Sequence, residues 1–575
     1  MNTAVKPPMY RWQDIPWTKI QRNVFKLQKR IYQASRCGNT QKMRELQKLL
    51  MKSEGTAFLA VRKVTQENRG KRTAGVDGKK ELKPDERLKL AQKLQENPYP
   101  EKTCPVRRIW IPKPGTKKQR PLGIPTIEDR AHQALAKLAL EPEWEAKFEP
   151  SSFGFRPGRS THDAIPIIYH SIRLTPKYVL DADIAKCFDR INHDALLEKL
   201  HTFPRMRRTI NRWLKAGVMD GGTLFPTEEG TPQGSIVSPL LANVALHGLE
   251  KAITQAFQKT KLLPATEKTK TKNEVVWTPK IVRYADDFVV LHRDYETIQK
   301  VKTIVAEWLK HMGLELQEEK TRITHTFSME GEIPGFDFLG FSIRQFRKGQ
   351  RQTKKGKFSS QYRTLIRPSK KAVTTHTREL SQTIRAMRSS SQEELIGKLN
   401  PKIVGWANYQ AIGLSRDRTR MDHILYCQLR RWALRRHPKK GDRWVMRKYW
   451  RLETGKWIFG TPDGDTILRT HCVKVKRQYA VRNSSIFDGD WVYWSRRMQK
   501  YPTISPWRAK LLKMQNGKCA FCGLYFNTQD LMEIDRTIPR PKTGTEQNPN
   551  MRLLHAHCRN RKTAREGLVG ITVND

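Results

Sequence analysis

Apolar and charged positions alternate with a helical period over residues 1–50. Val24, Leu27 and Ile31, and then Met43 and Leu46, recur every three or four residues among Lys, Arg and Gln. That spacing places the apolar side chains on one face of a helix. The same reasoning predicts helices over 82–95, 129–140, 240–250 and 295–311, and further apolar-faced helices between 395 and 434.

Runs of β-branched and aromatic residues predict strands. The run that begins at Tyr178 reads as one strand, and residues 281–290 read as strand, tight turn and strand. Residues 107–113 and 120–125 read as two strands that face each other. The pattern also predicts a strand and turn over 314–321, one strand over 336–342, and short strands such as 491–494.

The charge of the chain favours a polyanionic partner. Lys and Arg number 109 against 56 Asp and Glu, which gives a net charge of +53 over 575 residues. No apolar run approaches the roughly 20 residues needed to span a membrane, and Met1 to Pro16 lacks the apolar core of a signal peptide. We therefore expect nucleic acid, and not a membrane, as the partner.

Acidic residues stand next to or inside apolar strands. Asp286 and Asp287 lie between the two strands of 281–290, and Asp181 and Asp183 share one face of the strand before them. A carboxylate in such surroundings is costly unless it is paired or binds a cation, and Mg²⁺ prefers oxygen ligands. A solvated Asp-Asp turn and an acid pair at a helix N-terminus are the structural alternatives.

Three of the eight cysteines are close in sequence near the end of the chain. Cys519 and Cys522 are separated by two residues, and Cys558 follows His555 with the same spacing. Such spacing is typical of a zinc site, whereas a disulfide framework would be denser in a smaller chain. His557 is an alternative to His555 as the fourth ligand.

Several motifs together resemble a known family. Asp183 with Phe188, the loop Gly230-Thr-Pro-Gln-Gly234, Tyr284-Ala-Asp-Asp287, Lys320-Thr and Phe338-Leu-Gly-Phe341 occur in the order of a reverse transcriptase palm. Arg120-Pro-Leu-Gly-Ile-Pro125 and Ser152-Phe-Gly-Phe-Arg-Pro-Gly-Arg159 narrow the resemblance to group II intron proteins. Asn400–Tyr409 and Arg435–Lys440 resemble the maturase (X) domain of that family. The resemblance covers about residues 57 to 575.

The resemblance implies an α+β multidomain fold. It implies an N-terminal extension at 1–80, the fingers and palm of a right-hand polymerase at 81–350, and an α-helical thumb or maturase X domain at 351–455. A basic DNA-binding region at 456–505 and a small zinc-containing HNH-like ββα module at 506–575 follow. The cysteine usage and the layout suggest the reducing cytoplasm or nucleoid of a bacterium, with an organelle as the alternative.

It also implies roles for the residues of the palm. Asp183 and Asp286 would hold two Mg²⁺ ions, with Asp287 completing the acidic cluster and the carbonyl of Ile184 as a further ligand. Phe188 would exclude the 2′-hydroxyl of a ribonucleotide. The remaining nucleotide-binding residues would be Lys113, Arg120, Gln233, Gly234 and Lys320.

The HNH-like module at 506–575 departs from the endonuclease pattern that it resembles. Cys519, Cys522, His555 and Cys558 would hold a structural Zn²⁺, and Asn550 matches the pattern. Asp535 is present, but Arg536 stands where the pattern has a general-base His, and Arg559 stands where it has a later His that binds Mg²⁺. Since Arg stays protonated near neutral pH, it cannot act as a base. We expect a module that binds DNA and cuts it poorly or not at all. The alternative is a shifted alignment in which His555 or His557 supplies the missing function.

The resemblance therefore predicts an RNA-directed DNA polymerase that also acts as a maturase. The expected partners are the intron RNA, the target DNA and deoxynucleoside triphosphates. The alternative is an RNA-binding splicing factor in which the palm is kept only as a scaffold. The chain offers an intact acid set, Phe188 and a set of nucleotide-binding residues, which disfavours that alternative.

Overall fold

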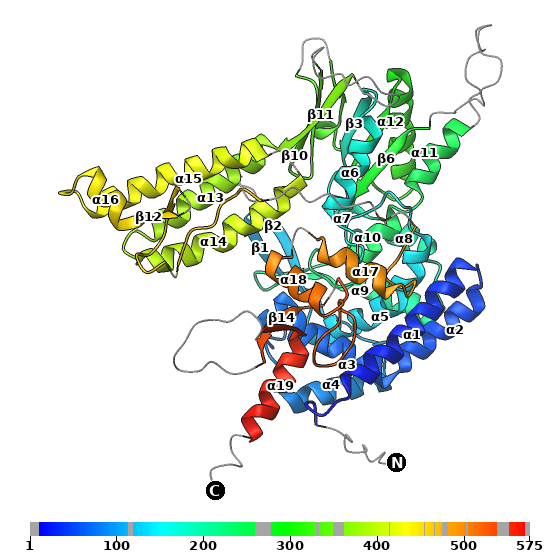
Figure 1. Cartoon of the computed structure of the whole chain (residues 1–575). Helices are drawn as coiled ribbons and strands as arrows, with labels where there is room; N and C mark the ends of the chain where they lie inside the picture. Colours follow the sequence, from blue (N-terminus) through cyan, green and yellow to red (C-terminus); the bar gives the residue numbers. More distant parts are fainter. Residues whose placement is uncertain are drawn as a thin grey trace.

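The structure is a computed structural model that describes most of the chain. The described residues are 11–112, 119–258, 278–328, 333–348, 361–412, 415–453, 455–464, 466–473, 481, 483–501, 504–528, 530–537 and 551–569. None of the helices in these ranges is both long and apolar enough to cross a membrane. Figure 1 shows a broad body from which one helical arm extends.

The N-terminal helices pack around one long helix of the body. The helices α1, α2 and α3 contact α5, and the predicted apolar positions Val24, Ile31 and Met43 are buried. Arg44 forms a buried ion pair with Glu143 of α5, at 2.6 Å. The bounds are α1 Trp17–Arg36, α2 Thr40–Lys52, α3 Glu54–Arg62, α4 Pro84–Glu96 and α5 Ile127–Lys147, with short turns of helix at Lys63–Glu67 and Arg69–Arg72.

A four-stranded sheet carries the first predicted hairpin. Its strand order is β2-β1-β4-β5, and β1 pairs antiparallel with β2 so that Ile111 lies opposite Arg120. The hairpin is therefore confirmed, while Lys113 lies outside the described residues. The bounds are β1 Val106–Pro112, β2 Gln119–Ile124, β4 Val218–Asp220 and β5 Thr223–Phe225.

A second four-stranded sheet, in the order β6-β7-β3-β8, forms the centre of the body. Its strands are buried on both faces: Leu180 and Phe288 belong to one apolar core, and Val179 and Val289 to another. Alternation along each strand divides these side chains between the two cores. The bounds are β3 Tyr178–Asp183, β6 Lys280–Tyr284, β7 Asp287–His292 and β8 Arg322–His325.

Helices cover this sheet and complete the two cores. Residues of α8, α9, α10, α11 and α12 belong to the first core, and residues of α6 to the second. The predicted helix at 295–311 is confirmed as α12. The bounds are α6 Thr161–Ile172, α7 Cys187–Arg190, α8 His193–Leu200, α9 Pro204–Leu214, α10 Ser238–Ala245, α11 Leu249–Gln258 and α12 Tyr295–Lys310.

Three local predictions for this part of the chain are wrong. The helix expected over 240–250 is two helices, because Gly248 has a φ of +98° between α10 and α11. The strand expected over 336–342 is a hairpin of β9 Phe336–Phe338 and β10 Phe341–Arg347, since Leu339 and Gly340 both have positive φ. Of the strand and turn expected over 314–321, the strand is only a single bridge from Leu316 to Ile184, whereas the turn is present as a 3₁₀ turn at Glu318–Lys320.

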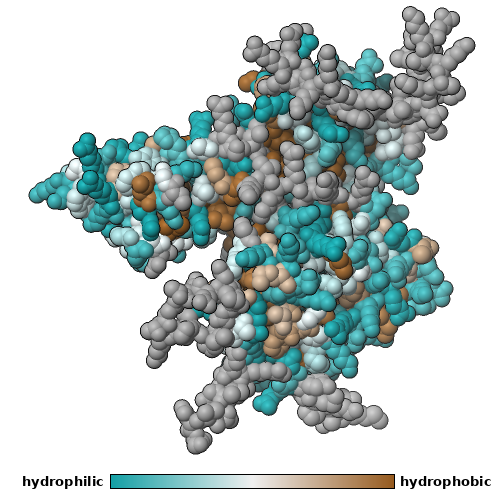
Figure 2. All heavy atoms as spheres, viewed as in Figure 1, coloured by the Kyte–Doolittle hydropathy of each residue, from teal (hydrophilic) through white to brown (hydrophobic). Residues whose placement is uncertain are grey.

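The arm of Figure 1 is a bundle of helices that follows a three-stranded sheet. The strand β11, Tyr362–Pro368, pairs with β10 and leads into the bundle. Figure 2 shows a largely hydrophilic face with apolar residues gathered along the arm and where the arm meets the body. The bounds are α13 Lys370–Ala386, α14 Gln392–Tyr409, α15 Ser415–Arg436, α16 Asp442–Tyr449, β12 Trp450–Glu453 and β13 Lys456–Phe459, with a 3₁₀ turn at Gln410–Ile412.

The last part of the chain returns to the body. Its bounds are α17 Trp491–Gln499, α18 Pro506–Met514, β14 Met532–Arg536, β15 Met551–His555 and α19 Ala556–Val569. The strand predicted at 491–494 is wrong, because Asp490 caps a helix there by accepting a hydrogen bond from the Tyr493 N–H at 2.9 Å. We call residues 483–569 of the described chain the C-terminal module.

The C-terminal module rests on the loop of residues 151–160. Tyr501 donates a hydrogen bond from its hydroxyl to the Gly158 carbonyl at 2.6 Å, and Thr528 accepts one from the Gly158 N–H at 3.1 Å. A Cβ on Gly158 would lie 2.6 Å from the Trp494 ring, so only glycine fits there. Arg497 forms a buried ion pair with Asp163. These contacts fix the module against the central part of the body.

A buried histidine pair joins the arm to the segment that follows it. The Nε2 atoms of His376 and His471 lie 3.0 Å apart, and His471 Nδ1 lies 2.6 Å from Asp422 Oδ1. The His376 ring also stacks on Trp406 at 4.9 Å. Burial and the neighbouring His471 lower the pKa of His376 to about 4.

This pair predicts a pH-dependent stability. The unfolded imidazole of His376 binds a proton below its ordinary pKa of 6.5, whereas the folded one does so only near 4. Stability is therefore lost as the pH falls through this range, by up to about 3 kcal/mol. His376→Gln removes the titrating group, so its thermal stability falls less between pH 6.5 and 4 than that of the wild type. The exposed His311→Gln serves as the control and keeps the wild-type slope.

Candidate functional site

Three carboxylates meet at one end of the central sheet. The pairing of β3 with β7 puts Asp183 directly opposite Asp287, and the pairing of β6 with β7 puts Tyr284 opposite Asp287. Ala285 and Asp286 form the turn between β6 and β7, with Ala285 in the left-handed conformation at φ 58°. Register and turn geometry thus bring together acids that are about 100 residues apart in sequence.

The cluster is poorly compensated by positive charge. Burial, followed by repulsion from Asp183, raises the pKa of Asp286, and Arg120 and Lys320 only partly oppose that shift. Burial and repulsion from Asp286 and Asp183 raise the pKa of Asp287 to about 7. Lys320 forms an ion pair with Asp183 Oδ2. An oxygen-rich site with excess negative charge suits a hard divalent cation.

Arg283 stabilises the hairpin that carries Asp286 through hydrogen bonds and an ion pair. Arg283 is 3% exposed and donates from Nη1 to the Ala285 carbonyl and to Asn243 Oδ1, each at 3.2 Å. Glu149 Oε2 lies 3.9 Å from Arg283 Nη2, and Glu149 Oε1 accepts a hydrogen bond from the Gly248 N–H at 2.6 Å. Hydrogen bonds and positive neighbours, above all His247, outweigh burial and lower the pKa of Glu149 to about 2.

The loop of residues 151–160 presses against the same hairpin. Ser151 accepts a hydrogen bond at its carbonyl from the Arg283 N–H, and Phe153 donates one to the Arg283 carbonyl, both at 2.9 Å. A Cβ on Gly154 would lie 2.3 Å from the Ala285 nitrogen. Glycine at 154 therefore allows the loop backbone to touch the turn that presents Asp286.

The glycine-rich loop 230–234 passes close to Phe188. Thr231 donates its N–H to the Phe188 carbonyl at 2.5 Å, and the Gln233 carbonyl accepts a hydrogen bond from the Gly123 N–H at 2.6 Å. Gly234, at φ +114°, has no room for a Cβ, which would lie 2.7 Å from the Gly123 carbonyl oxygen. Gln233 also donates from its side chain to Asp189 at 3.3 Å. The loop thus links β2 of the first sheet to α7, which follows β3 of the central sheet.

Phe188 is the second residue of α7 and contacts another aromatic ring. Its ring is half-buried and meets the ring of Phe155 edge-on, with the centroids 5.9 Å apart. Ile184 is buried. Arg120 is exposed on β2. Of the predicted palm residues, the structure therefore brings together Asp183, Asp286, Asp287, Lys320 and Arg120, with Phe188 and Gln233 joined through the loop 230–234.

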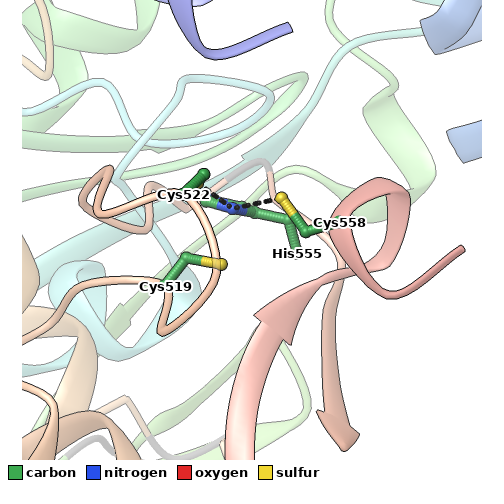
Figure 3. Close-up of side chains that lie close together, drawn as sticks. All are labelled: Cys519, Cys522, His555 and Cys558. Carbon is green, nitrogen blue, oxygen red and sulfur yellow. Dashed lines mark hydrogen bonds between the residues drawn. The ribbon is translucent and has the colours of Figure 1, made fainter. Parts of the chain in front are cut away.

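A second cluster, in the C-terminal module, consists of three thiols and one imidazole. One ligand atom from each of Cys519, Cys522, His555 and Cys558 lies within 4.8 Å of the others, and Figure 3 shows them turned toward one another. A tetrahedral zinc site with Zn–S bonds of about 2.3 Å would place its ligand atoms about 3.8 Å apart. His555 directs Nδ1 toward Cys522 and Cys558, at 3.4 and 3.8 Å, and Nε2 toward Asp530 at 3.3 Å. This donor set fits Zn²⁺ with an acid behind the histidine.

His557 is not one of the four clustered residues. Its ring stacks on that of His555 at 5.0 Å, and burial together with the nearby Arg62 lowers its pKa to about 2. The arrangement thus favours His555 over the alternative that the spacing left open.

Asp535, unlike the palm acids, is surrounded by positive charge. It is buried on β14, and its Oδ2 accepts from Arg552 Nε at 2.9 Å and from Lys562 Nζ at 2.8 Å. These two cations outweigh burial and hold its pKa below the ordinary value. Arg559 pairs with Glu533 at 2.9 Å, and Asn550 lies outside the described residues. The Arg536 carbonyl accepts from Lys562 at 2.8 Å.

Comparison with known proteins gives three consecutive family matches. Residues 12–94 match the N-terminal domain of reverse transcriptase, 111–343 match reverse transcriptase (RNA-dependent DNA polymerase), and 373–450 match the group II intron maturase-specific domain. The chain is 30% identical over 332 residues to protein YkfC of Escherichia coli, covering 52% of this chain and 83% of that protein. It is 32% identical over 334 residues to the group II intron-encoded protein LtrA of Lactococcus lactis subsp. cremoris.

The chain belongs to the group II intron-encoded protein family. Its reverse transcriptase domain is followed by a maturase domain, as the motifs predict. The chain spans about half the length of LtrA, since the match covers 49% of this chain and 54% of that protein. Maturase-like protein 1 of Euglena gracilis is 35% identical over 243 residues, with 42% of this chain and 52% of that protein covered.

Sequence reasoning missed the groups that position the palm acids of this group II intron-encoded protein. Glu149, Arg283 and Asn243 form a buried polar cluster, and Phe155 flanks Phe188. Arg283 inside an apolar strand is the one sequence signal, because a buried cation requires a carboxylate partner. Nothing in the sequence indicates which of the distant acids or amides supplies it.

We predict that Arg283→Met weakens the hairpin locally. The change leaves the Ala285 carbonyl and Asn243 Oδ1 without their donor and takes one positive neighbour from Glu149, which costs about 1–3 kcal/mol. Hydrogen exchange of the β6 and β7 amides should therefore accelerate, up to the limit set by global unfolding. The double variant Arg283→Met with Glu149→Gln should recover part of the protection. Unchanged exchange in the single variant would contradict the assigned role of Arg283.

Proposed function

We propose that the chain is an RNA-directed DNA polymerase that copies the intron RNA from a primer in the target DNA, and a maturase that binds this RNA to promote splicing and retrohoming. The observation that supports the polymerase most directly is the convergence of Asp183, Asp286 and Asp287 on adjacent antiparallel strands. Intron RNA, target DNA and deoxynucleoside triphosphates are the proposed partners. The proposed setting is a bacterial cell, although the relatives also include proteins of Euglena.

The acids fit the two Mg²⁺ ions expected of a polymerase. Asp183 and Asp286 would hold them, with Asp287 and the carbonyl of Ile184 in support, because the raised pKa values of Asp286 and Asp287 reflect an unmet need for positive charge. Two bound Mg²⁺ ions supply activation of the primer hydroxyl and neutralisation of the leaving pyrophosphate. Lys320, now paired with Asp183, lies where it could exchange that partner for a nucleotide phosphate.

The surrounding residues would select and orient the nucleotide. Arg120, and Lys113 outside the described residues, would bind the triphosphate, since guanidinium forks match phosphate oxygens. Phe188 would meet the sugar and exclude a 2′-hydroxyl. Gln233 and Gly234 would lie under the new base pair on the loop that hydrogen-bonds Gly123.

The arm is the proposed thumb and RNA-binding surface. Lys440 and Lys448 both lie over the ring of Trp444, at 5.6 and 5.0 Å, and the Trp457 side chain is 53% exposed. Basic side chains next to exposed rings can contact phosphates and stack on unpaired bases. We assign the fingers and palm to 81–350, the thumb to 351–455 and a DNA-binding region to 456–505.

The module at 506–575 is proposed to be a Zn²⁺-stabilised, HNH-like DNA-binding module without efficient cleavage. Cys519, Cys522, His555 and Cys558 would hold the ion. A catalytic Mg²⁺ would have to displace Arg552 and Lys562 from Asp535, and Arg536 and Arg559 cannot supply a base.

The decisive test of the polymerase is a single substitution. Asp286→Asn should lower Mg²⁺-dependent DNA synthesis on a primed RNA template by more than about 100-fold, since even residues that only support a metal ligand contribute up to that factor. Asp294→Asn is the matched control, because Asp294 caps α12 at the surface and Asn caps equally well. Wild-type protein that binds intron RNA but makes no DNA would favour the splicing-factor alternative.

Cleavage of the target DNA tests the HNH-like module independently of the polymerase site. With the assembled RNA–protein particle and a strand-labelled duplex, we expect RNA-driven cutting of the top strand alone. The compensated charge of Asp535 predicts no bottom-strand product, with or without added Mg²⁺. A bottom-strand cut that Asp535→Ala abolishes would show that another residue supplies the base.

A further inference from the structure

Phe155 has a strained backbone conformation at the surface of the molecule. Its φ is +61°, in the left-handed region that favours glycine, and 48% of its side chain is exposed. A residue with a large side chain is disfavoured in this region because its Cβ comes too close to the following carbonyl oxygen. Such strain persists only where the surrounding structure imposes it, and it is concentrated at functional sites.

The residues on both sides of Phe155 impose this conformation. Gly154 lies against the turn between β6 and β7, since a Cβ on it would be 2.3 Å from the Ala285 nitrogen. Arg156 is 5% exposed, and its Nε and Nη2 atoms each donate to a carboxylate oxygen of Glu145 at 2.9 Å. The backbone between these two fixed residues therefore cannot relax while both contacts are kept.

On the side of the C-terminal module, Phe155 adjoins open space. A cavity of about 350 Å³ lies between the loop of residues 151–160 and the module, and its lining includes Phe155, Met498, Tyr501 and Ile504. Close packing from the module thus does not fix the Phe155 side chain. Its position depends on the strained backbone that carries it.

The ring of Phe155 contacts the ring of Phe188. Their centroids lie 5.9 Å apart and their planes are 83° from parallel, which is a favourable edge-to-face arrangement. Phe188 is only half-buried on α7, so the neighbouring rings decide where its own ring can lie. Two consecutive residues of the loop therefore contact two sides of the proposed nucleotide site: Gly154 contacts the turn of the acids, and Phe155 contacts Phe188.

We propose that Phe155 is a positioning residue that keeps Phe188 at the distance from the acids at which a 2′-hydroxyl is excluded. This inference rests on the proposed function, in which Phe188 selects the sugar. Exclusion of one small group requires that the excluding ring cannot retreat, because a shift of the ring would create the missing space. Since Gly154 contacts the turn that carries Asp286, the loop fixes both sides of that distance. Phe155 acts through Phe188 and not by contact with the nucleotide.

Nucleotide selection on a primed RNA template tests this role. The measured quantity is kcat/KM for a deoxyribonucleoside triphosphate divided by kcat/KM for the matching ribonucleoside triphosphate. Phe155→Leu removes the ring and should lower this ratio by about 10-fold or more, the least that one additional group in an apolar pocket is worth. Phe155→Tyr keeps the ring and should retain the wild-type ratio. An unchanged ratio in Phe155→Leu would overturn the proposal.

A double variant separates positioning from direct contact. Phe188→Ala removes the excluding ring, so the addition of Phe155→Leu should lower the ratio no further. Additive effects of the two substitutions would mean that Phe155 contacts the nucleotide itself, which would overturn the positioning role.

Phe225→Leu is the matched control. Phe225 is 47% exposed, like Phe155, but it lies on the edge strand β5, at the opposite edge of its sheet from β2 and Arg120. This variant should keep the wild-type ratio. Wild-type protein that makes no DNA would overturn the proposed function and this inference with it. Equal selection of deoxynucleotides by the wild type and by Phe155→Leu would overturn this inference alone.

Discussion

The central constraint on this molecule is the repulsion among three carboxylates at the end of one sheet. Asp183, Asp286 and Asp287 are placed together by strand register, and the pKa values of the last two are raised as a result. Such a cluster opposes folding until a cation arrives. The two apolar cores that bury both faces of the sheet, and the Arg283–Glu149 pair beneath the hairpin, offset that cost.

An aspartate of the C-terminal module has the opposite electrostatic surroundings. Asp535 receives two cations within hydrogen-bonding distance, and its pKa lies below the ordinary value. A carboxylate that already has two cationic partners stabilises the protein but binds a metal ion weakly. The palm acids therefore remain able to bind cations, whereas Asp535 is already neutralised by Arg552 and Lys562.

The spacing of apolar residues predicted the helices and strands that depend on local sequence alone. The hairpin around Asp286, the facing strands at 107–125 and the helix α12 all follow from apolar spacing. The errors occur where a single backbone feature overrides that spacing: Gly248 divides a helix, Leu339 and Gly340 turn a strand into a hairpin, and Asp490 starts a helix among aromatic residues. The acids could be found because their motif is local. Asn243 and Phe155 could not, since only tertiary packing brings them to the hairpin.

The loop of residues 151–160 touches two parts of the molecule through two glycines. Gly154 lies against the turn that carries Asp286, and Gly158 lies under Trp494 of the C-terminal module. Five residues of backbone therefore contact two neighbours at once, and neither glycine can change without disturbing one of them. In evolutionary terms, the module is not an interchangeable cassette. A lineage that lost or replaced it would lose the steric limit that Trp494 sets at position 158, where only the φ of +73° would still favour glycine, while position 154 stayed fixed. Asn or Asp at position 158 beside an unchanged Gly154 would therefore mark members without a docked module.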